Sequence, residues 1–511
     1  MDLIHSDAFT QRVQALQKEW HVPSVSVATF DQHDITAKAF GLASLEPSTA
    51  ATTETLYDIA STTKSITAAC IGHLVGDGPF TWTTPVASIL GDDWALVDET
   101  ATKITTLEDI LCHRSGMPRH DLSYLGVTAR VPDTPRSVTL NLRNLPLTAA
   151  PRTKWQYCNM MYTVAAHIVE KTSGQSYEQF LKDRVLDKLD MQSTYVQPSG
   201  VVKAGQSHRF STPYLWRKQL ERYDAAERRD MPEGQGAGLL QSTPADYARW
   251  VQAVMTKNPA LLDEAIYEQL IKPRIIVDPG STDEDLPPAT SPQMYALGWE
   301  MEFYRGVRIV RHDGAEVGYG SIMMFVPKFQ FGVVIMGNSS GAGDVAYLLA
   351  MELTDSVLDV PERDKAEAKA QRQRLAKKEA EDDDEEEKKL REELLKEDTD
   401  DHNAPLMVPI PLTSYTGTYS NPGYHEVTLD IKNRQLHLDA TDRGFPFTVT
   451  FEQVGHSGRR FIGHLVDDEF DGSYKRVEFE VDADGEVQVK SVGIDLCSQM
   501  KPDLVWFARC A

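Results

Sequence analysis

The chain has 511 residues, a net charge of −24 and five cysteines. That length exceeds one ordinary hydrophobic core, so two or more domains are expected. The negative charge argues against nucleic acid and membranes as partners. Neither a membrane span nor a secretory signal is recognisable, so the sequence predicts a cytoplasmic protein.

The cysteines are scattered along the chain and lack the close pairs of a zinc site. Free thiols in a reducing compartment are therefore favoured over a disulfide framework. No motif for a metal or an organic cofactor is present, so we expect none.

Residues 1–358 mix helical and strand patterns. The elements expected in chain order are a helix near 7–19, strands at 24–30 and 35–40, helices from Ser61 and over 159–172, strands at 308–311, 321–326 and 331–336, and a helix over 344–358. Strands at both ends and helices in the middle predict one sheet built from both termini and covered by a helical subdomain.

Two further regions follow. Residues 359–404 are highly charged, with 17 acids and 11 bases in 362–401. This composition predicts a charged helical or disordered linker, with a docking arm as the alternative. Residues 405–511 contain alternating apolar residues around two turns, at Asn433 and at Asp484, which predicts hairpins and a small antiparallel β-barrel.

Ser61 and Lys64 stand at the start of a helical pattern. Three residues apart on a helix, their side chains share one face. A serine hydroxyl is a poor nucleophile until a base takes its proton, and a lysine becomes such a base when burial lowers its pKa. The spacing alone is weak, because it recurs by chance on ordinary helix surfaces.

Two further candidates lie downstream. Tyr157 and Asn159 point the same way in an extended turn, so a phenol and an amide would face one cavity. His312 and Gly314 follow a predicted strand, where a glycine allows close backbone approach. Alone, each pattern is more often structural than catalytic.

Together these residues resemble a known family. Ser61-x-x-Lys64, Tyr157-x-Asn159 and His312-x-Gly314 occur in the order of the three motifs of serine β-lactamases and penicillin-binding proteins. Segments 111–117, 189–194, 236–239 and 297–299 are similar to the class C β-lactamase-related group, which includes D-aminopeptidases, esterases and acyltransferases. The segment 415–419 resembles the start of the lipocalin-like barrel of some members.

The resemblance implies a β-lactamase/transpeptidase-like α+β domain and a role for each residue. Ser61 would be the acylated nucleophile, Lys64 its base, and Tyr157 the group that passes protons to the leaving group. Asn159 would orient Lys64 and contact substrate. The backbone N–H groups of Ser61 and Ala315 would form the oxyanion hole, where one donor is worth about 3–4 kcal/mol.

Two departures from the family pattern concern His312 and Cys158. Classical β-lactamases have a lysine at the position of His312, and a mostly neutral histidine would hold a substrate carboxylate weakly. Cys158 stands where serine or alanine is usual and is a rival nucleophile without a motif of its own. His113 is expected to be structural.

The leading hypothesis is a serine hydrolase that acts on an amide or ester of a small molecule or short peptide. An acyltransferase with the same acyl-enzyme is the alternative within catalysis, and a non-catalytic scaffold is the alternative outside it. Tyr214, Trp216 and Tyr223 either contact the substrate or pack a loop. The barrel either caps the cleft or mediates homo-oligomerisation.

Overall fold

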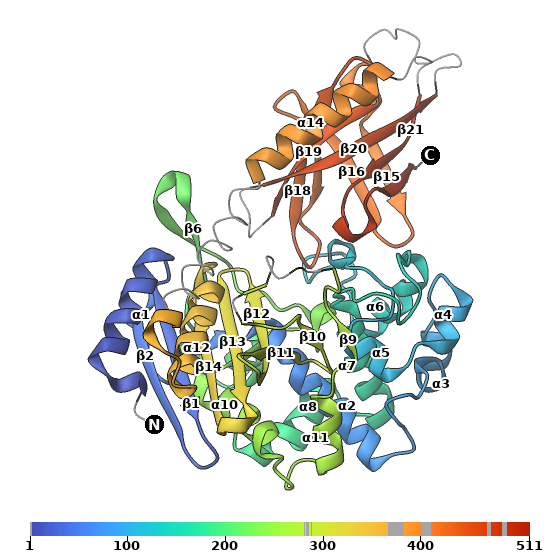
Figure 1. Ribbon diagram of the computed structural model, residues 1–511. Helices are drawn as coiled ribbons and strands as arrows, with labels where there is room; N and C mark the ends of the chain where they lie inside the picture. Colours follow the sequence, from blue (N-terminus) through green and yellow to red (C-terminus); the bar gives the residue numbers. More distant parts are fainter. Residues whose placement is uncertain are drawn as a thin grey trace.

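The computed structural model describes residues 3–280, 282, 286–287, 289–365, 383–400, 410–467, 472–482 and 488–510. Figure 1 shows a larger body of helices and strands with a β-barrel above it. The two bodies meet at residues that follow α5 (Leu107–Leu111) in the chain.

The larger body is built around an antiparallel sheet of nine strands. In spatial order these are β3 (Thr49–Ala50), β2 (Ile35–Ser44), β1 (Ser24–Phe30), β14 (Phe331–Gly337), β13 (Tyr319–Val326), β12 (Val307–Glu316), β11 (Glu300–Tyr304), β10 (Met294–Tyr295) and β9 (Ile275–Ile276). The first and last strands of the region meet in the centre, with Val27 opposite Ile335. The predicted sheet from both termini is therefore confirmed.

Helices cover both faces of the sheet (Figure 1). On one face α12 (Ala342–Val357) packs against β13, whose alternate residues Ile322 and Met324 lie in that core, and α1 (Asp7–Glu19) packs against β1, β2 and α12. Met323 and Phe325 point to the other face, which α10 (Pro244–Thr256) and α2 (Thr63–Asp77) cover. Because both faces are covered, β1, β13 and β14 are buried along their whole length.

A helical subdomain surrounds α2, as predicted. Its other helices are α3 (Val86–Leu90), α4 (Glu99–Ile104), α5, α6 (Pro135–Asn141), α7 (Met160–Ser173), α8 (Tyr177–Leu181), α9 (Gln197–Lys203) and α11 (Glu264–Leu270). Two small sheets lie outside the nine-stranded sheet, formed by β4 (Tyr57–Asp58), β8 (Leu240–Ser242) and β5 (Tyr195–Val196), and by β6 (Tyr214–Arg217) and β7 (Arg222–Ala225). The predicted helix over 159–172 is α7, which ends at a left-handed Gly174.

The C-terminal body is a closed antiparallel barrel of eight strands, which confirms the predicted barrel. The strands are β15 (Gly417–Asn421), β16 (His425–Lys432), β17 (Gln435–Ala440), β18 (Phe447–Val454), β19 (Arg460–Asp467), β20 (Ser473–Asp482), β21 (Gln488–Ile494) and β22 (Val505–Arg509). Aromatic rings of Tyr415, Phe461 and Phe479 pack against one another in its core.

The charged region predicted as a linker contains a helix. Residues 366–382 and 401–404 lie outside the described residues, whereas α14 (Asp383–Asp400) is a helix against the barrel wall (Figure 1). Leu394 is fully buried against Val454 and Ile462. Leu390 packs against the same cluster, so α14 buries an apolar face although its composition is highly charged.

Two sequence expectations concern the whole chain. All five cysteines are free thiols, as predicted, and four of them are buried. Among the described residues, no helix combines the length and the apolar character that a membrane crossing requires.

Candidate active site

Ser61 lies in a tight turn, η2 (Ala60–Thr62), that leads directly into α2. The preceding Ala60 has a φ of +48°, a left-handed conformation that is costly for alanine. The carboxylate of Asp58 accepts the Ala60 N–H at 2.7 Å and thereby helps to fix the turn. Burial raises the pKa of Asp58 to about 7, although hydrogen bonds from Ala60 and Gln241 oppose that rise.

Lys64 is the direct partner of Ser61, as the helical spacing predicted. Its Nζ lies 2.9 Å from Ser61 Oγ and 2.7 Å from the carbonyl oxygen of Ala237, and its side chain is fully buried. Burial lowers the pKa of Lys64 well below its usual value, and the charge of Arg119 lowers it further. A buried lysine with a lowered pKa that touches a serine hydroxyl is suited to accept its proton.

Tyr157 lies beside this pair, again as the sequence indicated. Lys64 Nζ is 4.8 Å from the centre of the Tyr157 ring, and the Arg119 guanidinium is 5.2 Å from the same point. Burial raises the pKa of Tyr157, while a hydrogen bond with Ser61 and the charge of Arg119 oppose that rise. The phenol therefore keeps its proton at neutral pH and can donate it.

His113 packs against the ring of Tyr157 and is hydrogen-bonded to the neighbouring Cys158. The His113 ring packs 4.2 Å from the Tyr157 ring, and its Nδ1 accepts the Cys158 N–H at 3.1 Å. Both side chains are fully buried, and burial raises the pKa of the Cys158 thiol to about 12. A buried thiol that stays protonated is a poor nucleophile, so this geometry favours the structural role for both residues.

Asn159 has a partner that the sequence did not reveal. Its Nδ2 donates to Asp121 Oδ2 at 3.0 Å, and the same oxygen accepts Arg119 Nε at 2.9 Å. Lys64 was expected to be oriented by Asn159, but its second partner is the carbonyl of Ala237. Arg119 and Asp121 come just after the family-like segment 111–117. Their closeness to that segment in the sequence is the feature by which they could have been identified as site residues.

His312 is buried and neutral. Its Nε2 lies 2.8 Å from the Tyr295 hydroxyl, and its Nδ1 lies 2.6 Å from the Asp313 carbonyl oxygen. Because a carbonyl only accepts, Nδ1 carries the proton and Nε2 accepts from Tyr295. Burial lowers the pKa of His312 to about 4, and the charge of Lys64 acts in the same direction. His312 thus offers a substrate carboxylate no positive charge.

Gly314 allows β12 to touch the turn that carries Ser61. A Cβ at this position would lie 2.4 Å from the Ile59 carbonyl oxygen and 2.3 Å from Ser321 Oγ. Any larger residue would push β12 away from η2. The glycine therefore brings the exposed Ala315 close to the turn of Ser61, although the close approach is between two backbones rather than to a ligand.

The barrel holds the segment that supplies Arg119 and Asp121. The Arg119 N–H donates to Gln499 Oε1 at 2.7 Å, and His120 Nδ1 lies 2.8 Å from the Tyr424 hydroxyl. Further along, the Gly126 N–H donates to the Asp442 carbonyl at 2.9 Å and the Gly444 N–H to the Tyr124 carbonyl at 3.0 Å. The active-site segment is thus fixed from the second body.

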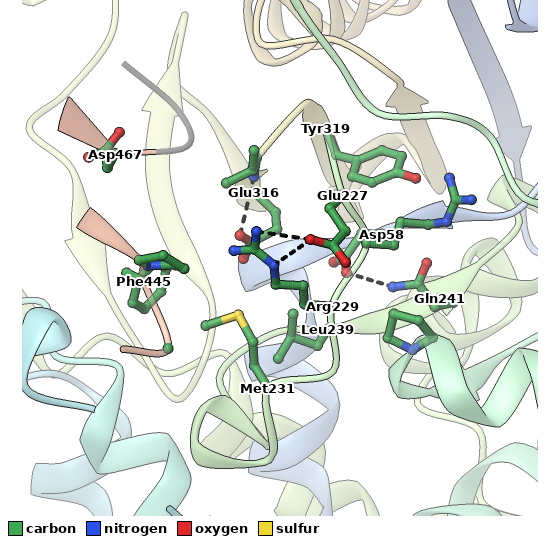
Figure 2. Close-up of a pocket in the computed structure, with 15 residues that line it drawn as sticks. Asp58, Glu227, Arg229, Met231, Leu239, Gln241, Glu316, Tyr319, Phe445 and Asp467 are labelled. Atoms are coloured by element: carbon green, nitrogen blue, oxygen red, sulfur yellow. Dashed lines mark hydrogen bonds and ion pairs between the residues drawn. The ribbon is translucent and has the colours of Figure 1, made fainter. Parts of the chain in front are cut away.

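A cavity lies between the two bodies beside the end of β12 (Figure 2). Its lining comes from β4, from β8 and the residues before it, from residues 227–231, from Glu316 and Val317, and from the barrel residues Gly444, Phe445, Pro446 and Asp467. Tyr214, Trp216 and Tyr223 do not line it. Trp216 instead stacks on His21 with ring centres 3.7 Å apart and packs against Tyr223. These contacts agree with a role in loop packing rather than in substrate contact.

No group of three or more metal-binding side chains occurs among the residues that the structure describes.

Comparisons with known proteins agree with this geometry. A family model for beta-lactamases matches residues 9–354, and one for a domain of unknown function, DUF3471, matches residues 401–509. The chain is 32% identical over 456 residues to the unguisins hydrolase ungD' of Aspergillus campestris, covering 87% of this chain and 82% of that protein.

Solved structures show the same fold. The octameric penicillin-binding protein homologue from Pyrococcus abyssi superposes with a TM-score of 0.60 at 20% identity, covering 96% of this chain and 98% of that one. The D-amino acid amidase from Ochrobactrum anthropi SV3 superposes with a TM-score of 0.54 at 21% identity, covering 68% and 97%. The first of these similarities spans both bodies.

Proposed function

The chain belongs to the beta-lactamase family and is a serine hydrolase, and we propose that it cleaves an amide or ester bond through an acyl-enzyme on Ser61. The observation that carries this proposal is the 2.9 Å contact between Ser61 Oγ and the fully buried Lys64 Nζ. Burial lowers the pKa of Lys64 well below its usual value, which favours the uncharged form that can act as a base.

The reaction has two halves. Ser61 Oγ attacks the carbonyl carbon while its proton passes to Lys64, and the carbonyl oxygen becomes an anion that the N–H groups of Ser61 and Ala315 stabilise. Tyr157 then donates its proton to the leaving amine or alcohol, and the scissile bond breaks. A water molecule then attacks the ester carbonyl carbon while the Tyr157 oxygen takes one of its protons. The bond between the acyl carbon and Ser61 Oγ breaks, and Lys64 returns its proton to Ser61 Oγ, which releases the acid and restores all three residues.

The substrate we propose is a small molecule or short peptide that is not a penicillin. Support comes from the relative whose name describes it as a hydrolase of unguisins. The buried, neutral His312 also supports it, because a β-lactam carboxylate would find no cation there. An acyltransferase, a homo-oligomer and a cytoplasmic location stay predictions.

Intact-mass spectrometry tests the acyl-enzyme. The protein is mixed separately with a p-nitrophenyl ester, a D-amino-acid amide and a β-lactam, and Ser61→Ala and Cys158→Ala are treated in parallel. We expect an adduct or turnover with the ester or amide in the wild type and in Cys158→Ala, and none in Ser61→Ala. Activity that survives in Ser61→Ala but not in Cys158→Ala would overturn the proposal, and no reaction at all would support the scaffold.

A further inference from the structure

We propose that the cavity between the two bodies binds an apolar side chain on the acyl part of the substrate, and that the barrel residue Phe445 sets its size. This inference rests on the proposed function. We call this cavity the acyl pocket and define it by its apolar lining residues Met231, Leu239, Val317, Phe445 and Pro446.

The position of the pocket relative to Ser61 supports this assignment. Asp58, which lines the pocket, also accepts the N–H of Ala60, the residue before Ser61. Glu316 ends β12 directly after Ala315, and Val317 follows it in the chain. Pairing of β11 with β12 ends at Arg311, and β12 contacts the turn of Ser61. The pocket therefore begins one or two residues from the proposed oxyanion hole.

The position of the proton donor Tyr157 determines how the substrate is oriented in the site. Tyr157 must reach the leaving group, which therefore lies on the side of Tyr157, Asn159 and Arg119. The fourth substituent of the tetrahedral carbon, the acyl chain, points away from that side. Glu316, the last residue of β12, and Val317 after it line the pocket and follow Ala315, whose N–H would bind the oxyanion.

The lining favours an uncharged group. Met231 and Leu239 are buried, and Phe445 and Val317 are half-buried, so together they offer an apolar surface. Figure 2 shows Arg229 paired with Glu227 at 3.0 Å, and the Gln241 amide donating a hydrogen bond to Asp58 at 2.6 Å, so these polar groups have partners within the protein. Glu316 and Asp467 are half-exposed and can stay hydrated.

The size of the pocket limits what it holds. Its volume is about 80 Å³, several times the roughly 10–15 Å³ that one water molecule needs. That space suits a short aliphatic chain. Extending the pocket requires moving or truncating one of its walls, of which Phe445 is the wall from the second body.

The barrel wall cannot shift freely. The N–H of Gly444, next to Phe445, donates to the backbone carbonyl of Tyr124. The neighbouring Arg443 pairs with Leu125 in an isolated backbone β-bridge. A Cβ on Gly444 would lie 2.4 Å from Glu233 Oε1, so the hairpin is packed tightly against the larger body. Phe445 is therefore held in place by both bodies, as a size-limiting residue needs to be.

A series of p-nitrophenyl esters with a constant leaving group tests the pocket. Each methylene that enters an apolar pocket should raise kcat/KM about fourfold, so the wild type should prefer butyrate over acetate and gain no more at hexanoate. Phe445→Ala should raise the ratio of hexanoate to acetate kcat/KM at least fivefold. Val317→Phe, which fills the pocket, should lower the ratio of butyrate to acetate at least fivefold.

The control is Trp506→Ala, an aromatic truncation at a different barrel cavity that Arg459 and Glu480 also line. Its ratios should equal those of the wild type. The acyl pocket is overturned if acetate hydrolysis depends on Ser61 but both Phe445→Ala and Val317→Phe keep wild-type ratios. Hydrolysis of acetate that persists in Ser61→Ala would instead overturn the proposed function, and the pocket with it.

Discussion

The two bodies of this protein differ in what they bury. The larger body buries Lys64, His113 and His312 close together, since burial displaces the pKa of each one and the charge of Lys64 lowers the pKa of both histidines. The barrel core instead contains aromatic rings such as those of Phe461 and Phe479. Desolvated ionisable groups are where chemistry is expected, so the difference assigns catalysis to the larger body and positioning to the barrel.

The segment 119–126 connects these two roles. It presents Arg119 and Asp121 to Tyr157 and Asn159 on one side, and it binds Tyr424 and Gln499 of the barrel on the other. The comparison is therefore tested by changing the catalytic groups, then this segment, then its barrel supports, and finally the outer wall of the barrel.

The largest effect is expected from Lys64→Met. Methionine fills a similar volume without a charge, so the buried site should stay packed while the base is lost. Loss of a general base costs about 10²–10⁴ in rate, and kcat/KM for the ester should fall by that factor. The exposed Lys103→Met is the control. A variant that keeps more than a tenth of the activity would show that Lys64 is not the base.

The next effect concerns the pH dependence of kcat/KM. Lys64 acts as a base only when unprotonated, so activity is present above its pKa and lost as pH falls through it. Arg119 lowers that pKa and Asp121 raises it. The pH below which kcat/KM falls should therefore be higher in Arg119→Gln and lower in Asp121→Asn than in the wild type; we call this part of the profile the acid limb.

The exposed Arg136→Gln, whose partner is Asp93, is the control for these pH profiles and should leave the limb in place. Identical limbs in wild type, Arg119→Gln and Asp121→Asn would mean that a group other than Lys64 governs the reaction.

A smaller effect is expected from the barrel supports. Tyr424→Phe removes the hydroxyl that holds His120, and Gln499→Ala removes the acceptor of the Arg119 N–H. One such hydrogen bond contributes about 0.5–1.5 kcal/mol, so kcat should fall roughly two- to tenfold. Because the acyl pocket is untouched, the KM of the acetate ester should change less than kcat.

Tyr415→Phe is matched to Tyr424→Phe, since it also removes a buried tyrosine hydroxyl, here one that donates to the Gly458 carbonyl at 2.7 Å within the barrel. It should lower thermal stability to a similar extent but leave kcat unchanged. Equal losses of kcat in both variants would reduce the barrel to a stabilising domain without a positioning role.

The parts of the site that the sequence predicted are those that local geometry fixes. Ser61 and Lys64 are one helical turn apart, and Tyr157 and Asn159 are two residues apart in a turn, so their spacing carried the signal. The pair of Asn159 with Asp121 joins residues 38 apart. Its geometry depends on barrel residues more than 300 positions away, which no local pattern encodes.

The same reasoning explains the helix α14. Its composition is dominated by charges, and overall composition correctly indicates a solvated surface. It does not reveal that Leu390 and Leu394, four residues apart, share one face. The partner surface of Val454 and Ile462 lies on barrel strands, so the packing was visible only once the barrel was in place.

The smallest effect on activity is expected from Leu394→Ala. Truncation of a buried leucine lowers the free energy of unfolding by about 2–5 kcal/mol. Because the apolar cluster around Leu394 is small, we expect a loss at the lower end of that range. Ion pairs such as Arg391 with Glu452 are partly exposed and offset little of that loss. The helix should therefore detach more readily, which limited proteolysis measures, while ester turnover stays at the wild-type rate.

Leu395→Ala is the matched control, because Leu395 is 44% exposed and its truncation should leave proteolysis unchanged. An effect of Leu394→Ala on turnover as large as that of Tyr424→Phe would contradict the division of roles between the two bodies. The outer wall of the barrel would then be coupled to Ser61, and the barrel strands between α14 and Phe445 would have to transmit that coupling.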